Sequence, residues 1–129
     1  MLVVIDTNVL VSALWSKSGV PAQVLALMQN RRLTPCNDSR ILAEYWRVLR
    51  RSKFDFSEWE ITGLLTQIEG DGVSVVPCPL PLPFIDEDDR KFSEVAKHCN
   101  ATLITGNIKN FPKDELVQSV ADVLASLSE

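Results

Sequence analysis

A chain of 129 residues is the size of one domain and can bury roughly two thirds of its unfolded surface without help from disulfides or metals. Its hydrophobic share of 46% and charged share of 23% are ordinary for a globular protein, and no apolar run approaches the ~20 residues that span a bilayer. No basic leader precedes the first apolar stretch. We therefore expect one domain over residues 1–129 that is cytoplasmic and has no membrane partner.

The cysteines and the histidine exclude several kinds of site. Cys36, Cys78 and Cys99 are odd in number and form no Cys-x-x-Cys pair, which argues against a disulfide framework or a thiolate zinc site. We expect them to be buried small hydrophobes. His98 is the only histidine, so a multi-histidine metal site is excluded. Any chemistry is therefore expected to depend on carboxylates.

The charge is unevenly distributed along the chain. A net charge of −4 argues weakly against a nucleic-acid partner. However, seven of the 13 basic residues and only two acids lie between Arg31 and Lys53, which gives that segment a net charge of +5 and leaves −9 for the rest. This basic stripe indicates either a surface for a polyanion beside an acidic site or an ordinary solvated helix face.

The first predicted element is a strand over Leu2–Ile5, because a continuous apolar, β-branched run is typical of a strand that is covered on both faces. Asp6 then lies at the carboxyl end of this strand. In open α/β sheets ligands bind beyond the carboxyl ends of the strands, so Asp6 is a candidate functional carboxylate.

The pattern in the middle of the chain predicts three helices and two strands. A helix over 20–30 with proline near its start precedes a strand over 33–36. A helix over 40–51 follows, capped by the cluster at 37–39, with Glu44 on the border between an apolar arc (Ile41, Leu42, Tyr45, Val48, Leu49) and a basic face (Arg40, Arg47, Arg50, Arg51). The next helix, over 57–69, is expected to be capped by Ser57 and to stop at Gly70 or Gly72, before a strand over 73–76.

The last third begins with a proline-rich connector over 77–83, which excludes a helix there. The acidic run at 86–89 opens a helix whose apolar residues are Phe92, Val95, Ala96 and Cys99, and a strand over 102–105 follows. The end of the chain is either a short strand over 116–118 and a helix over 120–127 or one continuous helix. The alternation of strands and helices predicts a parallel sheet with helices on both faces.

Four polar side chains have related places in this arrangement. Asp6 and Asn107 follow strands, Asp89 begins a helix and Glu44 lies inside one. In a parallel sheet all but Glu44 converge at the same edge by topology alone. Clustered carboxylates repel one another unless a cation compensates them, so three together favour a site for Mg²⁺ or Mn²⁺.

Each acid also has a structural interpretation. Asp6 alone is equally consistent with a turn or a helix cap. Glu44 can be an ordinary surface residue paired with Arg40 or Arg47. The acids Asp86, Asp88 and Asp89 can stabilise the start of a helix through its dipole.

Four segments in order carry a resemblance to a known family: Val4-Ile5-Asp6-Thr7-Asn8-Val9-Leu10, the helix Ile41-Leu42-Ala43-Glu44-Tyr45-Trp46-Arg47-Val48-Leu49, Asp86-Glu87-Asp88-Asp89-Arg90-Lys91-Phe92 and Leu103-Ile104-Thr105-Gly106-Asn107. Together they closely resemble PIN-domain ribonucleases, in the branch regarded as toxins of toxin–antitoxin systems. The resemblance implies a Rossmann-like α/β/α sandwich with a parallel sheet of four to five strands in the order 3-2-1-4-5. It also implies metal-dependent endonuclease activity on single-stranded or structured RNA.

The same resemblance assigns roles to residues. The metal ligands would be Asp6, Glu44 and Asp89, supported by hydrogen bonds from Thr7, Asn8, Ser12 and Thr105. Asp89 is preferred within its acidic run because Ala96 follows it at the family's spacing, with Asp86 and Asp88 as further contributors. Asn107 stands where the family often has Asp, which removes one negative charge, and Val120 stands where relatives often have Pro.

The resulting hypothesis is in-line hydrolysis of a phosphodiester by water that Mg²⁺ or Mn²⁺ activates, leaving a 5′-phosphate and a 3′-hydroxyl. The candidates for binding the RNA backbone are Arg40, Arg47, Arg50 and Lys91. The toxin resemblance also implies a small antitoxin partner and a homodimer formed through helices. Trp46, Phe54 and Trp59 are candidate interface residues or core residues.

Three alternatives belong to other classes. A receiver-like signalling domain needs a phospho-accepting Asp after the third strand, where Pro77-Cys78-Pro79 stands instead. A phosphatase of the Asp-x-Asp kind fails because position 8 is Asn. A PIN-like binding module with weak or no activity remains open, and Asn107 is the best argument for it.

Overall fold

The computed structural model describes residues 1–114 and 116–128. Its strands are β1 (Leu2–Ile5), β2 (Thr34–Asn37), β3 (Val73–Ser74), β4 (Thr102–Ile104) and β5 (Val117–Gln118). Its helices are α1 (Thr7–Trp15), α2 (Val20–Gln29), α3 (Ser39–Leu49), α4 (Glu58–Asp71), α5 (Arg90–Cys99) and α6 (Val120–Leu127). Short 3-10 turns form η1 (Ser52–Phe54), η2 (Glu87–Asp89) and η3 (Ile108–Asn110).

The five strands form one parallel sheet in the order β3-β2-β1-β4-β5, which confirms the expected 3-2-1-4-5 arrangement. The central strand β1 pairs with β2 on one side and β4 on the other, with Val3 opposite both Pro35 and Thr102. Its residues 3–5 are buried, as expected for an apolar run covered on both faces. The sequence therefore positions Asp6 at the middle of the sheet's carboxyl edge.

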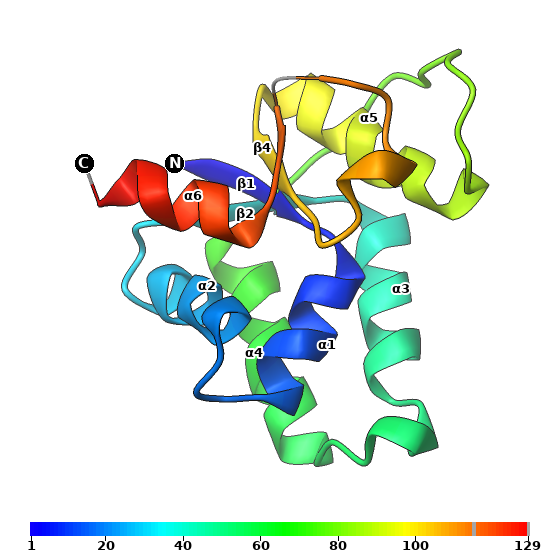
Figure 1. Ribbon diagram of the computed structural model, residues 1–129. Coiled ribbons are helices and arrows are strands. Elements are labelled where there is room, and N and C mark those ends of the chain that lie inside the picture. The colour runs from blue at the N-terminus through cyan, green and yellow to red at the C-terminus, as the bar shows by residue number, and fades with distance from the viewer. Residues whose placement is uncertain (115, 129) are drawn as a thin grey trace.

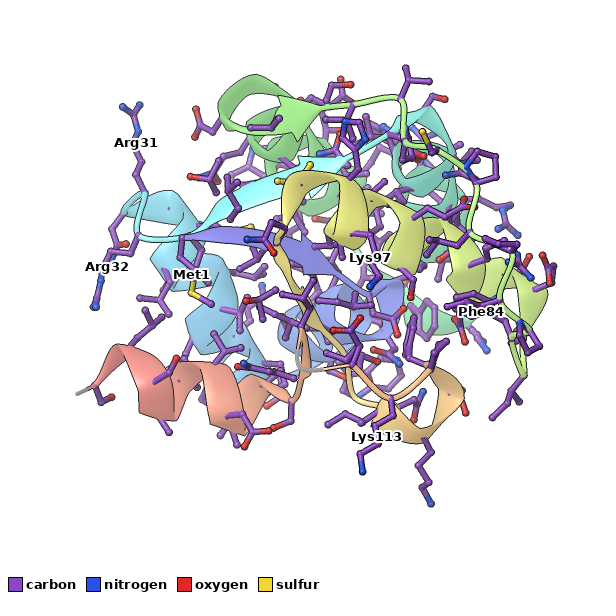
Figure 2. The ribbon with its side chains drawn as sticks, turned by 90° about the horizontal axis from the view of Figure 1, so that it is seen from above. Met1, Arg31, Arg32, Phe84, Lys97 and Lys113 are labelled. Atoms are coloured by element: carbon purple, nitrogen blue, oxygen red, sulfur yellow. The ribbon has the colours of Figure 1, made fainter. Side chains whose placement is uncertain are left out.

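Helices cover both faces of the sheet (Figure 1). Helix α5 packs against β1, β2 and β4 on one face, and the view from above shows it lying across these strands (Figure 2). Helices α1, α2 and α4 lie below the sheet in Figure 1, and α6 packs against α2. The buried apolar side chains form one contiguous cluster, whose largest members include Tyr45, Phe92, Leu10, Ile61 and Leu103. The Rossmann-like α/β/α arrangement is thus confirmed.

Local signals explain most of the helix ends. Asp38 accepts a hydrogen bond from the Ile41 N–H and Ser57 accepts one from the Glu60 N–H, so both predicted caps are confirmed. Helix α4 stops at Gly72, the second of the two expected positions. A Cβ at Gly72 would lie 2.3 Å from the Ile68 carbonyl oxygen and 2.8 Å from that of Pro35, so only glycine fits this crossing into β3.

The structure differs from the expectations in three places. Helix α1 was not predicted, because the polar start Asp6-Thr7-Asn8 obscures it; the signal for it is the helical spacing of Val9, Leu10 and Ala13, which are buried. Strand β3 ends at Ser74 instead of Val76. The expectation that all three cysteines are buried is wrong for Cys78, which is exposed on the proline-rich connector.

The end of the chain follows the first of the two predicted alternatives, with β5 and α6 as separate elements. Ser119 and Asp122 form a capping box at the start of α6, so this helix begins without the proline that relatives often have at position 120. Among the helices of the described ranges, none combines the length and apolar character that crossing a membrane requires.

Candidate functional site

Asp6 connects the ends of two neighbouring strands. Its N–H donates to the Ile104 carbonyl at 2.9 Å, and its Oδ2 accepts a hydrogen bond from Thr105 Oγ1 at 2.8 Å. Thr105 Oγ1 in turn accepts from the Asn107 N–H at 3.0 Å. Asp6 precedes α1 without a side-chain capping bond and is only 6% exposed. A buried carboxylate that caps no helix is unusual, so the simple capping interpretation does not explain Asp6.

Glu44 reaches the same edge from α3. The buried Tyr45 donates its hydroxyl to the carbonyl oxygen of Ile5, which fixes α3 against the end of β1. Glu44 Oε2 accepts a hydrogen bond from Thr7 Oγ1 on α1, and Glu44 Oε1 lies 2.7 Å from Lys91 Nζ on α5. Glu44 is therefore held by three helices at the edge where Asp6 lies, instead of pointing into solvent.

The acidic run before α5 divides into two roles. Asp86 is the cap of η2, since its Oδ1 accepts the Asp88 N–H at 3.0 Å. Asp89 is half-buried at the start of α5 and makes no side-chain capping bond. Asp86 thus has a capping role, whereas within the described residues no capping hydrogen bond ties the Asp89 carboxylate to the start of its helix.

The three predicted acids lie close enough to perturb one another. Burial, then the repulsion of Glu44, raises the pKa of Asp6, although the hydrogen bond from Thr105 and the charge of Lys91 oppose this. Burial and the charges of Asp6, Asp86 and Glu44 raise the pKa of Asp89 to about 6. Both shifts favour a proton or a cation at this edge, as expected where carboxylates share a site.

The donor set suits a hard cation in its chemistry. Carboxylate oxygens are the ligands that Mg²⁺ and Mn²⁺ prefer, and the Oδ1 atom of Asn8, buried beside Gly106, has no hydrogen-bond partner in the part of the chain that the structure describes. In residues 1–114 and 116–128, however, no three His, Cys, Asp or Glu side chains stand close enough to form a complete metal site as oriented. Both oxygens of Glu44 are already held, by Thr7 and Lys91.

Asn107 and Ser12, which were also predicted to belong to the site, make no side-chain hydrogen bond to the three acids within the described residues. Asn107 is exposed, and its only described hydrogen bond to the site is through its backbone N–H to Thr105. Ser12 is exposed on α1, and within the described residues its hydroxyl makes no hydrogen bond to the acids. The direct hydrogen bonds to the acids thus come from Thr7 and Thr105, while the roles of Asn8, Ser12 and Asn107 stay predictions.

The four predicted RNA-binding side chains have different neighbours. Arg40 forms ion pairs with Asp38 and Glu94, and Arg50 pairs with Glu58 while its guanidinium lies 4.6 Å from the Trp46 ring centroid. Lys91 pairs with Glu44. Arg47 is 62% exposed and approaches Glu44 only at 3.8 Å, so it is the most available of the four.

Sequence reasoning missed two features of this region. It paired Glu44 with Arg40 or Arg47 on the same helix, whereas the close partner is Lys91 on a different helix, a contact that no local spacing reveals. It also did not single out Arg90, which lines a groove between α3 and α5 together with Glu44. The other residues that line this groove are Arg40, Ala43, Arg47, Glu87, Asp88 and Lys91.

Comparison with known proteins identifies the family. Residues 2–109 match the family model of the PIN domain. The chain belongs to the PIN-domain family. This confirms the resemblance inferred from the four sequence segments, and the match covers the strand ends and helices that carry Asp6, Glu44 and Asp89.

Two similar proteins extend this result. The uncharacterized protein MJ1680 of Methanocaldococcus jannaschii is 34% identical to this PIN domain over 108 residues, which cover 81% of this chain and 70% of that protein. The crystal structure of VapBC2 from Rickettsia felis, bound to a DNA fragment from its promoter, contains a chain with the same fold. The match has a TM-score of 0.59 and 19% identity, and covers 92% of this chain and 98% of that one.

Proposed function

We propose that this PIN domain is a metal-dependent endoribonuclease and the toxin component of a toxin–antitoxin pair. The observation that carries the proposal is the meeting of Asp6, Glu44 and Asp89, from three separate parts of the chain, at the carboxyl edge of a parallel sheet. Burial and the neighbouring acids raise the pKa of Asp6 and Asp89, so keeping these carboxylates charged at this edge costs stability, and such a cost is typical of functional sites.

Asp6, Glu44 and Asp89 would hold Mg²⁺ or Mn²⁺. When bound, such a cation supplies an activated water and neutralises charge on the phosphodiester, giving a 5′-phosphate and a 3′-hydroxyl. The chain's own residues orient the ligands: Thr105 fixes the Asp6 carboxylate, and Thr7 fixes that of Glu44. These hydroxyls hold two acids in one orientation before any substrate arrives.

The groove between α3 and α5 is the proposed path of the RNA backbone. Arg47 stands at its wall with its side chain largely exposed, and Lys91 stands at the end nearest the acids. Contacts between basic side chains and phosphates release counterions from the RNA. Added salt opposes this release, so RNA binding should weaken as the salt concentration rises. Arg40 and Arg50 remain candidate contacts only to the extent that they can leave their present ion pairs.

A small antitoxin protein is the proposed partner, together with a second copy of the chain. The surface best suited to a protein is a groove between α1, α2 and α4, lined in part by Leu14, Leu25 and Trp59, whose side chain is 84% exposed. Exposed apolar grooves of this kind are typical of protein interfaces. The similar structure of VapBC2 on promoter DNA favours the antitoxin assignment.

A catalytically inactive binding module is the second candidate. Asn107 favours it, because the family often has Asp at that position and the site therefore has one negative charge fewer. Fewer charges lower the affinity for a divalent cation. The two candidates differ in one measurement, which is whether the purified chain cuts RNA when a cation is supplied.

The test is cleavage of defined RNAs with Mg²⁺, with Mn²⁺ and with EDTA. Asp6→Asn should lower cleavage by at least about 100-fold, since a lost ligand removes several kcal/mol of transition-state stabilisation. Asp122→Asn is the matched control: it removes the same charge from the exposed start of α6, away from the three acids, so activity should be retained. Full activity of Asp6→Asn rejects the assignment, and no cleavage by the wild type with either cation favours the binding module.

A further inference from the structure

Lys91 occupies an unusual position for a lysine. Its Nζ lies 2.7 Å from Glu44 Oε1, donates to the carbonyl oxygen of Asp88 and lies 5.1 Å from the Phe92 ring centroid. The side chain is only 12% exposed, whereas Lys17 and Lys97, which also form ion pairs, are 70% and 53% exposed. Lysine is almost never buried without a specific partner, so the ammonium group is held at this point by the acids around it.

The ammonium group stands where the negative charge is concentrated. It lowers the pKa of both Asp6 and Asp89 and therefore interacts with these acids as well as with Glu44. The only other cation close to Glu44 is the guanidinium of Arg47, which approaches at 3.8 Å and is mostly in solvent, counted over the residues the structure describes. Lys91 is thus the main internal counter-ion of three carboxylates.

Glu44 has no free oxygen while this ion pair exists. Thr7 Oγ1 holds Oε2 and Lys91 Nζ holds Oε1. Each carboxylate oxygen can accept more than one partner, so a divalent cation that binds Glu44 has to share an oxygen with one of these donors or displace it. The contact with Lys91 is the more easily lost, because a bound cation repels the ammonium group but does not repel the neutral hydroxyl of Thr7.

We propose that Lys91 is a tethered counter-ion that competes with the divalent cation for Glu44. In the metal-free protein it stabilises the acidic edge, and it leaves Glu44 Oε1 when the cation binds. The competition sets the cation concentration at which the site fills, so the charge at position 91 regulates metal loading. This inference rests on the proposed function, since it requires that Asp6, Glu44 and Asp89 bind a cation.

The test measures binding of Mn²⁺ to the purified chain by titration calorimetry and by the electron paramagnetic resonance signal of free Mn²⁺. Lys91→Met keeps the length and apolar stem of the side chain but removes its charge. Affinity for Mn²⁺ should rise by about tenfold, the scale expected when one charge near a partly buried site is removed. Lys91→Gln, a polar replacement, should also raise the affinity for Mn²⁺. Agreement between the two variants shows that the effect does not come from a folding defect specific to Met.

Two controls and one independent readout accompany this titration. Lys91→Arg keeps the charge, and Lys97→Met removes a charge from the exposed side of the same helix, so both should bind Mn²⁺ within about threefold of the wild type. In EDTA, Lys91→Met should melt a few degrees below the wild type, because the acids lose their counter-ion. Saturating Mn²⁺ should reduce this difference.

The outcomes separate this inference from the proposed function. If Lys91→Met and Lys91→Gln bind Mn²⁺ no more tightly than the wild type, while the wild type does bind it, the competition is disproved and the metal site stands. If neither the wild type nor any variant binds Mn²⁺, the metal site itself is disproved, and this inference with it. Tighter binding by both uncharged variants, with unchanged binding by Lys91→Arg and Lys97→Met, supports the tethered counter-ion.

Discussion

The chain contains two clusters of carboxylates that share an overall design but differ in how their charge is balanced. In the first, which we call the clamp, Arg40 joins the buried acids Asp38 and Glu94. In the second, the acidic edge, Lys91 stands among Asp6, Glu44 and Asp89. Among the described residues, the clamp sets Arg40 against two acids, whereas the acidic edge sets Lys91 against three, with the exposed Arg47 only at 3.8 Å from Glu44.

The hydrogen bonds differ as well. In the clamp every carboxylate oxygen accepts from an N–H group: Arg40 donates to Asp38 Oδ2 at 2.6 and 2.8 Å and to Glu94 Oε1 at 2.8 Å, while the backbone N–H groups of Ile41 and Leu80 donate to the other two oxygens. At the acidic edge two donors are neutral hydroxyls, and within the described residues the Asp89 carboxylate accepts no hydrogen bond. Removing one partner from a satisfied buried cluster is costly, whereas a cluster that keeps unsatisfied carboxylates is typical of a functional site.

The largest expected effect comes from breaking the clamp. Arg40→Met would leave Asp38 and Glu94 buried without a counter-ion, and removal of one partner from a buried pair typically costs 3–5 kcal/mol. Because the Arg40 side chain is 47% exposed, we expect a loss of about 2 to 4 kcal/mol in the free energy of unfolding, measured by urea denaturation. A loss below about 1 kcal/mol would show that the clamp contributes no more than a surface pair.

The second prediction applies one chemical change to both clusters in the metal-free protein. Asp6→Asn should raise the free energy of unfolding by about 1 kcal/mol, because it removes a repelled charge yet keeps an acceptor for Thr105. Asp38→Asn should lower it by a similar amount or more, since Arg40 loses its partner. Opposite signs support the distinction between clamp and acidic edge; the same sign for both, measured in EDTA at pH 7, contradicts it.

This distinction also separates what the sequence could predict from what it could not. The parallel sheet and the place of Asp6 at its carboxyl edge follow from patterns of adjacent residues and from topology, so both were predictable, whereas the strand order came from the resemblance to PIN domains. The interface of Glu44 with Lys91 joins two helices 47 positions apart, and the bridge from Arg40 to Glu94 spans 54. Such contacts depend on side-chain packing between separate elements, and a helical wheel shows only the residues of one helix.

Contacts between separate elements also limit what the sequence can predict about the function of Arg40. The sequence placed it on the basic face of a helix and so predicted RNA contact, a role that remains a prediction. The structure gives it two buried acidic partners, one of which, Glu94, lay in no predicted site. Helix α1 was missed for a related reason, because the polar residues that build the site interrupt its apolar pattern.

The third prediction uses pH to sharpen the comparison. Burial and the neighbouring acids raise the pKa of Asp89 to about 6 from a usual value of 3.8, so the folded protein retains a proton that the unfolded chain has lost between these values. Protonated Asp89 therefore contributes stability that is fully present below about pH 3.8 and is lost as the pH rises through 6. Relative to Asp89→Asn, the wild type in EDTA should lose a few degrees of melting temperature between pH 5 and pH 7.

The control for this pH profile is Asp86→Asn, which removes a neighbouring charge without removing the titrating group. It should keep the same direction of pH dependence with a smaller slope, because Asp86 is one of the charges that raise the pKa of Asp89. Saturating Mn²⁺ should reverse the slope, since protons then compete with the cation. A wild-type profile parallel to that of Asp89→Asn in EDTA would contradict the assignment of the shift to this site.

The smallest expected effect concerns a surface ion pair that belongs to neither cluster. Arg50 pairs with Glu58, and the two side chains are 51% and 61% exposed, so Arg50→Gln should change the free energy of unfolding by less than about 0.5 kcal/mol. With stability unaffected, the same variant isolates the predicted role of Arg50 in RNA binding. If Arg50 contacts a phosphate, the slope of log binding constant against log salt concentration should fall by about one, measured by filter binding with Asp6→Asn as an uncleaving background. An unchanged slope would assign Arg50 to the helix surface alone and confine the RNA path to the groove beside Arg47 and the acidic edge.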